Sequence, residues 1–169
     1  ALLRAKELAA KGVELFASPA LRFFLCNKIN KDEFYKNPVC LDNFIQLDDN
    51  DIWTSLKVWC NHPDIVLSTL SQGLVNRKLF KVEVLSSPIS PTRKEEILQK
   101  ISQQLNISKK EANYFISTSL IENNMYRKED DSIEILFNDG TTQNIADASD
   151  MLNISLLSRK VKKYYVCFL

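Results

Sequence analysis

The segment Ser86-Ser87-Pro88-Ile89-Ser90-Pro91 constrains the fold of this 169-residue chain more than any other. Neither a helix nor a strand can run through it, because proline lacks the backbone N–H and serine favours turns and caps. We therefore expect a linker at residues 86–91. It separates a mainly helical segment, residues 1–85, from a small domain at residues 92–169, and the predicted fold class is α+β.

Helical signals dominate the part before the linker. Ser18-Pro19 is typical of a helix start, and Asp48-Asp49 precedes a helix that carries Ile52, Leu56 and Trp59 on one face. Pro63 ends that helix and predicts an antiparallel helical hairpin with the apolar stretch that follows. The remaining expectations are a helix over 2–15, a polar connection over 30–38, a short helix over 39–44 and a strand over 79–85.

Mixed signals follow the linker. Thr92 to Glu95 and Ser108 to Glu111 have the spacing of capping boxes, and each predicts a helix. The turn signal Asn138-Asp139-Gly140 predicts that residues 133–137 pair back with the stretch from Thr141. Further strands are expected over 114–121 and 163–169, and a short helix over 146–152. Together these elements predict helices beside an antiparallel sheet.

The amino-acid composition argues against several classes of function. The 22 Lys and Arg nearly balance the 21 Asp and Glu, so the net charge of +1 argues against a dedicated nucleic-acid binder. Three glycines leave no Gly-rich phosphate loop. No apolar run is long enough to cross a membrane, and the charged first residues do not form a signal peptide. None of the four cysteines forms a C-x-x-C pair, so we expect reduced thiols, no zinc and a cytoplasmic location.

No complete catalytic set is visible. His62 is the sole histidine, and its position between two predicted helices favours a capping role over metal binding or base catalysis. The carboxylates at 48–51, 129–131 and 147–150 lack the spacing of a calcium loop and fit solvated caps and turns. We therefore predict no catalytic residue, no metal ligand and no cofactor in this chain.

Arg77 and Lys81 are the candidate binding residues. They lie at the transition from a predicted helix to a predicted strand, where an Arg fork and a Lys charge could hold a polyphosphate. The alternative is a solvated basic edge. A second basic stretch, residues 159–163, could contact nucleic acid, although Tyr164 and Tyr165 are more simply strand residues.

Ten segments, taken in their order along the chain, carry a resemblance to a known family: Arg4 to Leu8, Gly12 to Phe16, Ser18 to Leu21, Leu47 to Trp53, Lys57 to Trp59, His62 to Asp64, Asn76 to Lys81, Glu111 to Phe115, Ile135 to Gly140 and Val161 to Tyr165. They cover most of the chain. Together they resemble HD-superfamily phosphohydrolases, most closely the bacterial deoxynucleotide triphosphohydrolase type. The animal sterile-alpha-motif and HD-domain enzyme belongs to the same broader group.

The resemblance implies a parent enzyme that uses a divalent metal to hydrolyse a dNTP to a deoxynucleoside and triphosphate. That metal site needs a His-Asp dipeptide and a second histidine, which this chain lacks. The resemblance therefore implies a C-terminal portion, inactive alone, whose partners are an upstream HD domain and further copies in a homo-oligomer. In regulated relatives an Arg-x-Leu-aromatic-Lys segment contacts the phosphates of an activating nucleotide, and Arg77, Leu79, Phe80 and Lys81 match it. Val82-Glu83-Val84 replaces the aromatic-Val-Gly run that usually follows.

A second hypothesis remains open. Residues 92–165 permit a winged-helix-like module that binds nucleic acid or protein, supported by two capped helices, the strands and the basic tail. The near-neutral charge counts against nucleic acid. Binding that weakens steeply with salt favours this second hypothesis, whereas Arg77-dependent binding of a nucleoside triphosphate favours the first.

Overall fold

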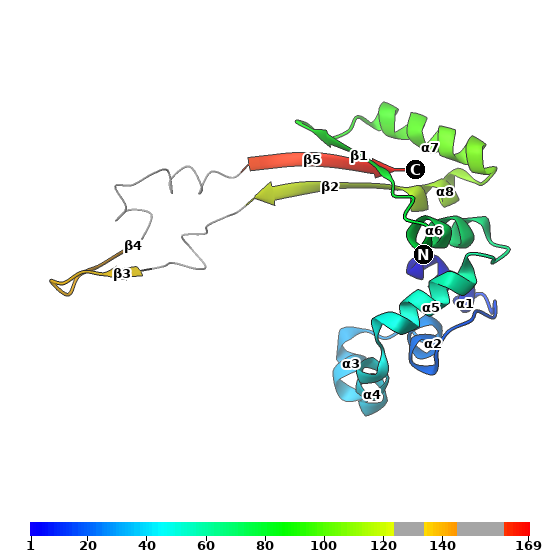
Figure 1. The fold of residues 1–169 in the computed structure, drawn as a ribbon, viewed down its shortest axis with the longest axis horizontal. Coiled ribbons are helices and arrows are strands. Elements are labelled where there is room, and N and C mark those ends of the chain that lie inside the picture. Colours follow the sequence, from blue (N-terminus) through cyan, green and yellow to red (C-terminus); the bar gives the residue numbers. More distant parts are fainter. Residues whose placement is uncertain (124–133, 145–160) are drawn as a thin grey trace. The chain divides into compact units, whose positions relative to one another are not determined.

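The computed structural model describes residues 1–123, 134–144 and 161–169, which form an α+β fold as predicted (Figure 1). The chain divides into two compact units. The first comprises residues 1–81, 95–116 and 168–169, and the second comprises residues 82–94 and the described residues between 117 and 167. Residues 86–91, the predicted linker, thus lie inside the second unit, and most of the helix that follows them belongs to the first.

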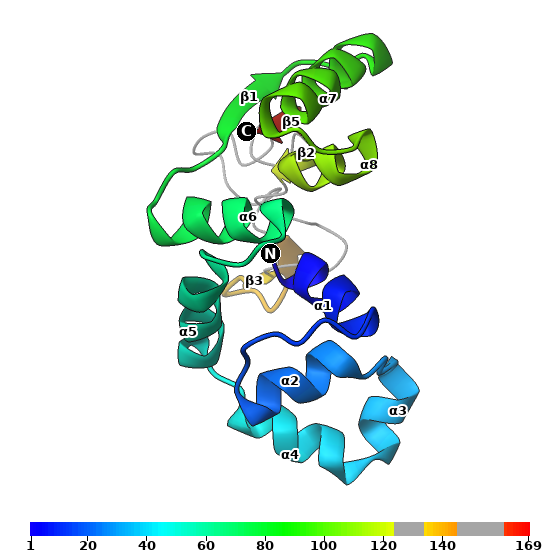
Figure 2. The same ribbon diagram turned by 90° about the vertical axis from the view of Figure 1, so that its right-hand side faces the viewer.

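Residues 1–81, all of which are described, contain six helices (Figure 2): α1 (Leu2–Ala10), α2 (Pro19–Cys26), α3 (Lys31–Lys36), α4 (Pro38–Gln46), α5 (Asp49–Trp59) and α6 (Ile65–Val75). The predicted starts of α2 and α5 are confirmed. The Ser18 hydroxyl accepts the Leu21 N–H at 3.3 Å, and the Asp48 carboxylate accepts the Asn50 and Asp51 N–H groups at 2.8 and 3.1 Å.

Two predictions about where the helices of this part lie are wrong. The first helix ends at Ala10 rather than residue 15, because Gly12 takes a φ of +80° and turns the chain out of the helix. Residues 30–38 are not a simple connection, because α3 forms within them. The Asn30 side chain accepts the Glu33 N–H at 2.9 Å and Glu33 accepts the Asn30 N–H at 2.9 Å, a reciprocal cap that outweighs the polar composition.

The core of the first unit forms between α1, α2, α5 and α6, where the buried apolar residues are Ala5, Leu8, Leu15, Leu21, Leu25, Leu56, Trp59 and Leu67. Trp59 is 1% exposed, and its indole N–H donates to the Phe16 carbonyl at 3.0 Å. Helices α5 and α6 contact each other. Their axes point in different directions in Figure 2, so the antiparallel hairpin predicted from the short link is not what forms.

Three helices end in the same way. Helices α1, α6 and α7 (Pro91–Leu105) are each followed within two residues by a residue with positive φ. These residues are Gly12 at 80°, Arg77 at 55° and Asn106 at 52°. After α6, the Arg77 N–H donates to the Leu74 carbonyl at 3.3 Å and the Lys78 N–H donates to the Gly73 carbonyl at 2.8 Å. These paired hydrogen bonds define the Schellman motif, in which glycine or asparagine is usual and arginine is not.

Strand β1 (Lys81–Leu85), strand β2 (Ile116–Asn123) and strand β5 (Val161–Phe168) form a three-stranded sheet in the order β1-β5-β2. Strands β2 and β5 point in opposite directions in Figure 1. The sheet confirms the strands predicted near residues 79–85, 114–121 and 163–169. The second begins later than predicted, because Asn113–Phe115 form a 3₁₀ turn, η1.

The helices of this half also have capped starts. Ser108 and Glu111 form the predicted capping box at α8 (Lys109–Ala112). The box predicted at Thr92 is wrong, because α7 already begins at Pro91 and the Ser90 hydroxyl accepts the Arg93 N–H at 3.2 Å. Proline at the first helical position loses no hydrogen bond, because an N–H at that position has no partner within the helix. Pro91, the last residue of the predicted linker, is therefore the first residue of α7.

The predicted hairpin is present. Strand β3 (Glu134–Leu136) pairs antiparallel with β4 (Thr142–Asn144), with Glu134 opposite Asn144 and Leu136 opposite Thr142. In the turn, the Asp139 carboxylate accepts the Thr141 N–H at 2.9 Å. The predicted helix at 146–152 lies outside the described residues, as do the carboxylates at 129–131 and 147–150.

Candidate functional site

The segment Arg77–Lys81 joins α6 to β1 and holds the two predicted phosphate-binding residues. Arg77, Lys78, Leu79 and Lys81 are exposed, whereas Phe80 is half-buried and lies against Phe115 at 6.3 Å between ring centroids. Phe80 therefore anchors the segment and leaves its basic side chains at the surface.

Arg77 occupies an unusual backbone position. Its φ of 55° is left-handed, which costs a residue with a Cβ on the order of 1 kcal/mol or more. Within residues 1–123, 134–144 and 161–169 its guanidinium makes no hydrogen bond or ion pair, so no polar contact of the side chain offsets this cost. Such strain is often found at functional positions.

Lys81 is the first residue of β1. Its ammonium lies 5.6 Å from the centroid of the Phe168 ring, a cation–π distance. The neighbouring Glu83 is paired with Arg93 at 2.6 Å, so its negative charge is neutralised by a cation on α7. This pairing reduces the repulsion that Glu83 would exert on an anion beside Lys81.

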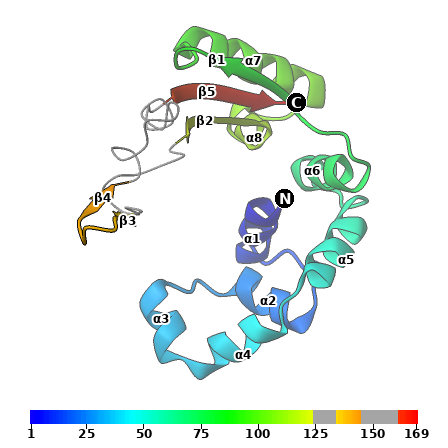
Figure 3. The same cartoon turned by 60° about the vertical axis from the view of Figure 1, so that its left-hand side comes forward.

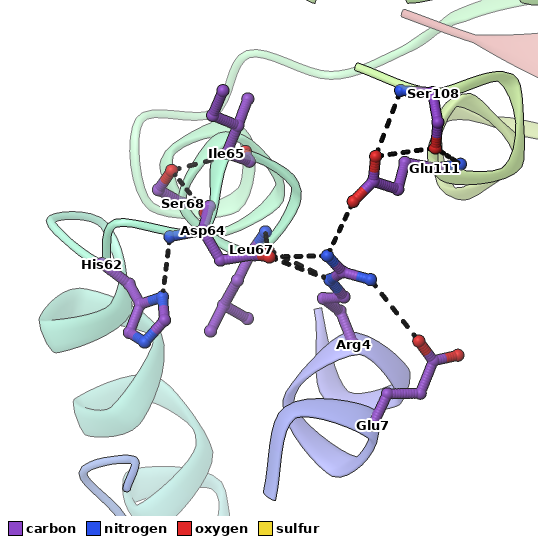
Figure 4. A network of polar contacts seen from close by, with 9 residues as sticks. All are labelled: Arg4, Glu7, His62, Asp64, Ile65, Leu67, Ser68, Ser108 and Glu111. Atoms are coloured by element: carbon purple, nitrogen blue, oxygen red, sulfur yellow. Dashed lines mark hydrogen bonds and ion pairs between the residues drawn. The ribbon is translucent and has the colours of Figure 1, made fainter. Parts of the chain in front are cut away.

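A larger polar network surrounds Arg4, which the sequence reasoning did not single out (Figure 4). Arg4 on α1 is only 7% exposed. Its Nη2 lies 2.6 Å from Asp64 Oδ2 and 2.9 Å from Glu111 Oε1, and its Nε lies 3.1 Å from Asp64 Oδ1. Its Nη1 is 3.6 Å from Glu7 Oε2, and its guanidinium is 5.7 Å from the centroid of the Tyr114 ring. One cation thus joins α1, α6 and α8.

The carboxylates of this network also cap helices. Asp64 accepts the Leu67 N–H at 2.8 Å at the start of α6, while Glu111 belongs to the capping box of α8. Burial opposes ionisation of Asp64, but the hydrogen bonds from Arg4 and Leu67 outweigh it and hold its pKa below the ordinary value. Hydrogen bonds from Ser108, together with the charge of Arg4, lower the pKa of Glu111. Every charge here has a partner, which indicates a structural tie.

His62 lies in the link between α5 and α6, as predicted. Its Nδ1 accepts the Asp64 N–H at 3.0 Å (Figure 4). The cap residues of the two helices are Cys60 and Asp64, so His62 contacts a cap residue without being one. Among the described residues, no group of three or more His, Cys, Asp or Glu side chains could hold a metal ion. The four cysteines are free. In the same described ranges, no helix is long and apolar enough to span a membrane.

Comparison with solved structures finds a similar protein, whereas the two sequence comparisons find none. No protein-family model matches the chain, and no curated protein sequence matches it. A solved crystal structure, that of a protein described as a phosphohydrolase from Bacteroides thetaiotaomicron, is 68% identical in sequence with a TM-score of 0.91. The match covers 99% of this chain and 41% of the relative, so the chain spans less than half of that protein's length.

Proposed function

We propose that this chain is the C-terminal regulatory and oligomerisation portion of an HD-type, metal-dependent nucleotide phosphohydrolase. The observation that carries the proposal is the 68% identity, along 99% of this chain, with part of a protein described as a phosphohydrolase. The parent enzyme hydrolyses a dNTP to a deoxynucleoside and inorganic triphosphate. It acts in the cytoplasm, where four free cysteines stay reduced.

The residues of this chain do not fit the catalytic metal of such an enzyme. The sequence has one histidine, and the described residues hold no cluster of three or more metal-ligating side chains. We assign the divalent metal to an upstream HD domain and derive no step of hydrolysis from the residues of this chain.

The role that we propose for the chain itself is nucleotide-dependent assembly. Arg77 and Lys81 bind the phosphates of a nucleoside triphosphate at a surface between copies of the protein. Two features support this: Arg77 is kept at a strained position with its guanidinium free of partners in the described part of the chain, and Glu83 is neutralised by Arg93. Binding that favours one assembly over another would regulate the enzyme by linkage.

A thermal-shift titration with dGTP, dATP and GTP tests the nucleotide site. A ligand that binds only the folded state at 100 times its Kd stabilises it by about 2.7 kcal/mol, so the melting temperature should rise with nucleotide. The rise should disappear in the Arg77→Ala, Lys81→Ala double variant. The matched control is Lys78→Ala with Lys57→Ala, which removes one exposed positive charge directly beside Arg77 and one on α5 and should keep the response. An equal loss in both variants would contradict a specific site.

The enzyme assignment needs a second experiment. Release of triphosphate from each dNTP is measured for residues 1–169 and for the longer protein that carries them. We expect release only from the longer protein with a divalent cation. Release of triphosphate by residues 1–169 alone would contradict the proposal that catalysis belongs to an upstream domain.

A further inference from the structure

A hollow of about 400 Å³ opens in the first unit beside α2, α3 and α4, which Figure 3 shows as neighbours, away from the Arg77–Lys81 segment. The residues that matter here are Lys6, Phe24, Asn30, Lys31, Phe34 and Phe44. Its volume lies in the range of small-molecule sites, roughly 300 to 1,000 Å³.

The apolar wall is aromatic. Phe34 on α3 and Phe44 on α4 meet edge to face, with ring centroids 5.5 Å apart, and Phe24 on α2 is likewise fixed against Phe23 at 5.3 Å. Phe44 remains 56% exposed although it lines the hollow. A flat ring placed against these faces would cover aromatic surface that water now contacts.

The polar part of the lining carries positive charge alone. Lys6 comes from α1 and Lys31 from the first turn of α3, and no acidic side chain lines the hollow among the described residues. Neither lysine has a hydrogen bond or ion pair with any residue that the structure describes. Two unpaired ammonium groups attract an anion by Coulomb interaction.

Asn30 adds a directed donor. Its side-chain oxygen accepts the Glu33 N–H at 2.9 Å in the cap of α3, which leaves its amide NH₂ to donate elsewhere. Asn30 and Lys31 lie together at the start of α3, whereas Lys6 comes from α1, so the polar groups of the lining come from two elements.

We propose that this hollow binds a small organic anion with a flat aromatic body, whose ring lies on Phe34 and Phe44 and whose anionic group is held by Lys6 and Lys31. The two parts of the ligand are recognised separately, so neither an inorganic anion nor a neutral arene should bind well alone. The proposal does not depend on the phosphohydrolase assignment, and its site shares no residue with Arg77 and Lys81.

Ligand-observed NMR and calorimetry with naphthalene-2-sulfonate test the site in the purified protein. We expect saturable binding at one site, at least tenfold tighter than that of 2-hydroxymethylnaphthalene or of methanesulfonate. The Lys6→Met, Lys31→Met double variant keeps the aliphatic stems and should weaken sulfonate binding at least tenfold. It should leave the weak binding of the neutral naphthalene unchanged.

Matched control variants distinguish binding in this hollow from nonspecific binding to the protein surface. Lys11→Met with Lys36→Met removes two exposed lysines at the ends of α1 and α3 that do not line the hollow, and affinity should be kept. Phe44→Ala should weaken binding while Tyr35→Ala should not. Melting temperatures near that of the parent protein confirm that each variant folds. Absent binding, equal binding of the neutral analogue or equal loss in the lysine controls would each overturn the proposal.

Discussion

Arg4 and Asp64, 60 positions apart in the sequence, form a bidentate ion pair. Nε of Arg4 lies 3.1 Å from Oδ1 of Asp64, and Nη2 lies 2.6 Å from Oδ2. The same Asp64 also accepts the Leu67 N–H at the start of α6. One carboxylate therefore begins a helix and fastens it to α1. The pair is the strongest candidate for a stability test.

Replacement of Arg4 by Met should destabilise the protein by about 3 kcal/mol, because removing one partner leaves a partly buried charge uncompensated. The measurement is urea unfolding followed by circular dichroism. Arg93→Met is the control: the Arg93 side chain is 53% exposed, and its pair with Glu83 should be worth less than about 1 kcal/mol. Equal losses in the two variants would show that the Arg4 network is no more than a surface contact.

Low pH should destabilise the folded protein through Asp64 and Glu111, the carboxylates that pair with Arg4. The pKa values of Asp64 and Glu111 are lowered in the folded protein. Their contribution is therefore fully present above the unfolded-state pKa values, about 3.9 for Asp and 4.3 for Glu, and is lost as the pH falls through the folded values. Unfolding free energies measured between pH 2.5 and 7 should drop below about pH 4. In Arg4→Met the drop should be shallower, and an unchanged profile would contradict this origin.

Glycine at position 77 should stabilise the fold. Arg77 occupies the left-handed position of a Schellman motif, as Gly12 and Asn106 do, and relief of its strain is worth about 1 kcal/mol. Arg77→Gly should therefore raise the melting temperature, whereas Arg77→Ala should not, although both remove the charge. If the proposed function is right, both variants lose the response to nucleotide, so the two effects of the residue can be measured separately.

Replacement of Ser71, the buried serine of α6, by alanine should leave the free energy of unfolding unchanged or increase it. Ser71 is fully buried, and its hydroxyl has no hydrogen-bond partner in the structure. Ser71→Ala removes an unsatisfied polar group and improves helix propensity, so the unfolding free energy should stay level or rise by up to about 1 kcal/mol. A loss above about 1 kcal/mol would indicate that the hydroxyl has a partner, such as a bound water.

The elements that were predicted from the sequence share one property: their signals lie within about four residues. Ser18, Asp48 and Ser108 each cap a helix through the next few N–H groups, and Asp139-Gly140 sets a hairpin turn in the same way. Capping and turn preferences that act over a few neighbouring residues are enough to predict these elements. The pair Asn30 and Glu33 carried the same signal for α3, which the polar composition around it concealed.

What the sequence could not reveal depends on contacts between distant positions. Arg4 meets Asp64 and Glu111 across 60 and 107 positions, and nothing in its neighbourhood marks it as different from Lys6 or Lys11. The hollow likewise needs four separate segments to come together. Arg77 and Lys81 were found from the sequence by their spacing and by resemblance, but the left-handed backbone of Arg77 was not.

The strand order β1-β5-β2 also has a consequence during protein synthesis. The middle strand, β5, is the last of the three to leave the ribosome, so the two outer strands emerge before the neighbour that joins them. Until then their backbone groups have no ladder between them, and unpaired strand edges favour misassembly with other nascent chains. The three-stranded sheet can therefore be completed only after β5, residues 161–168, has been synthesised.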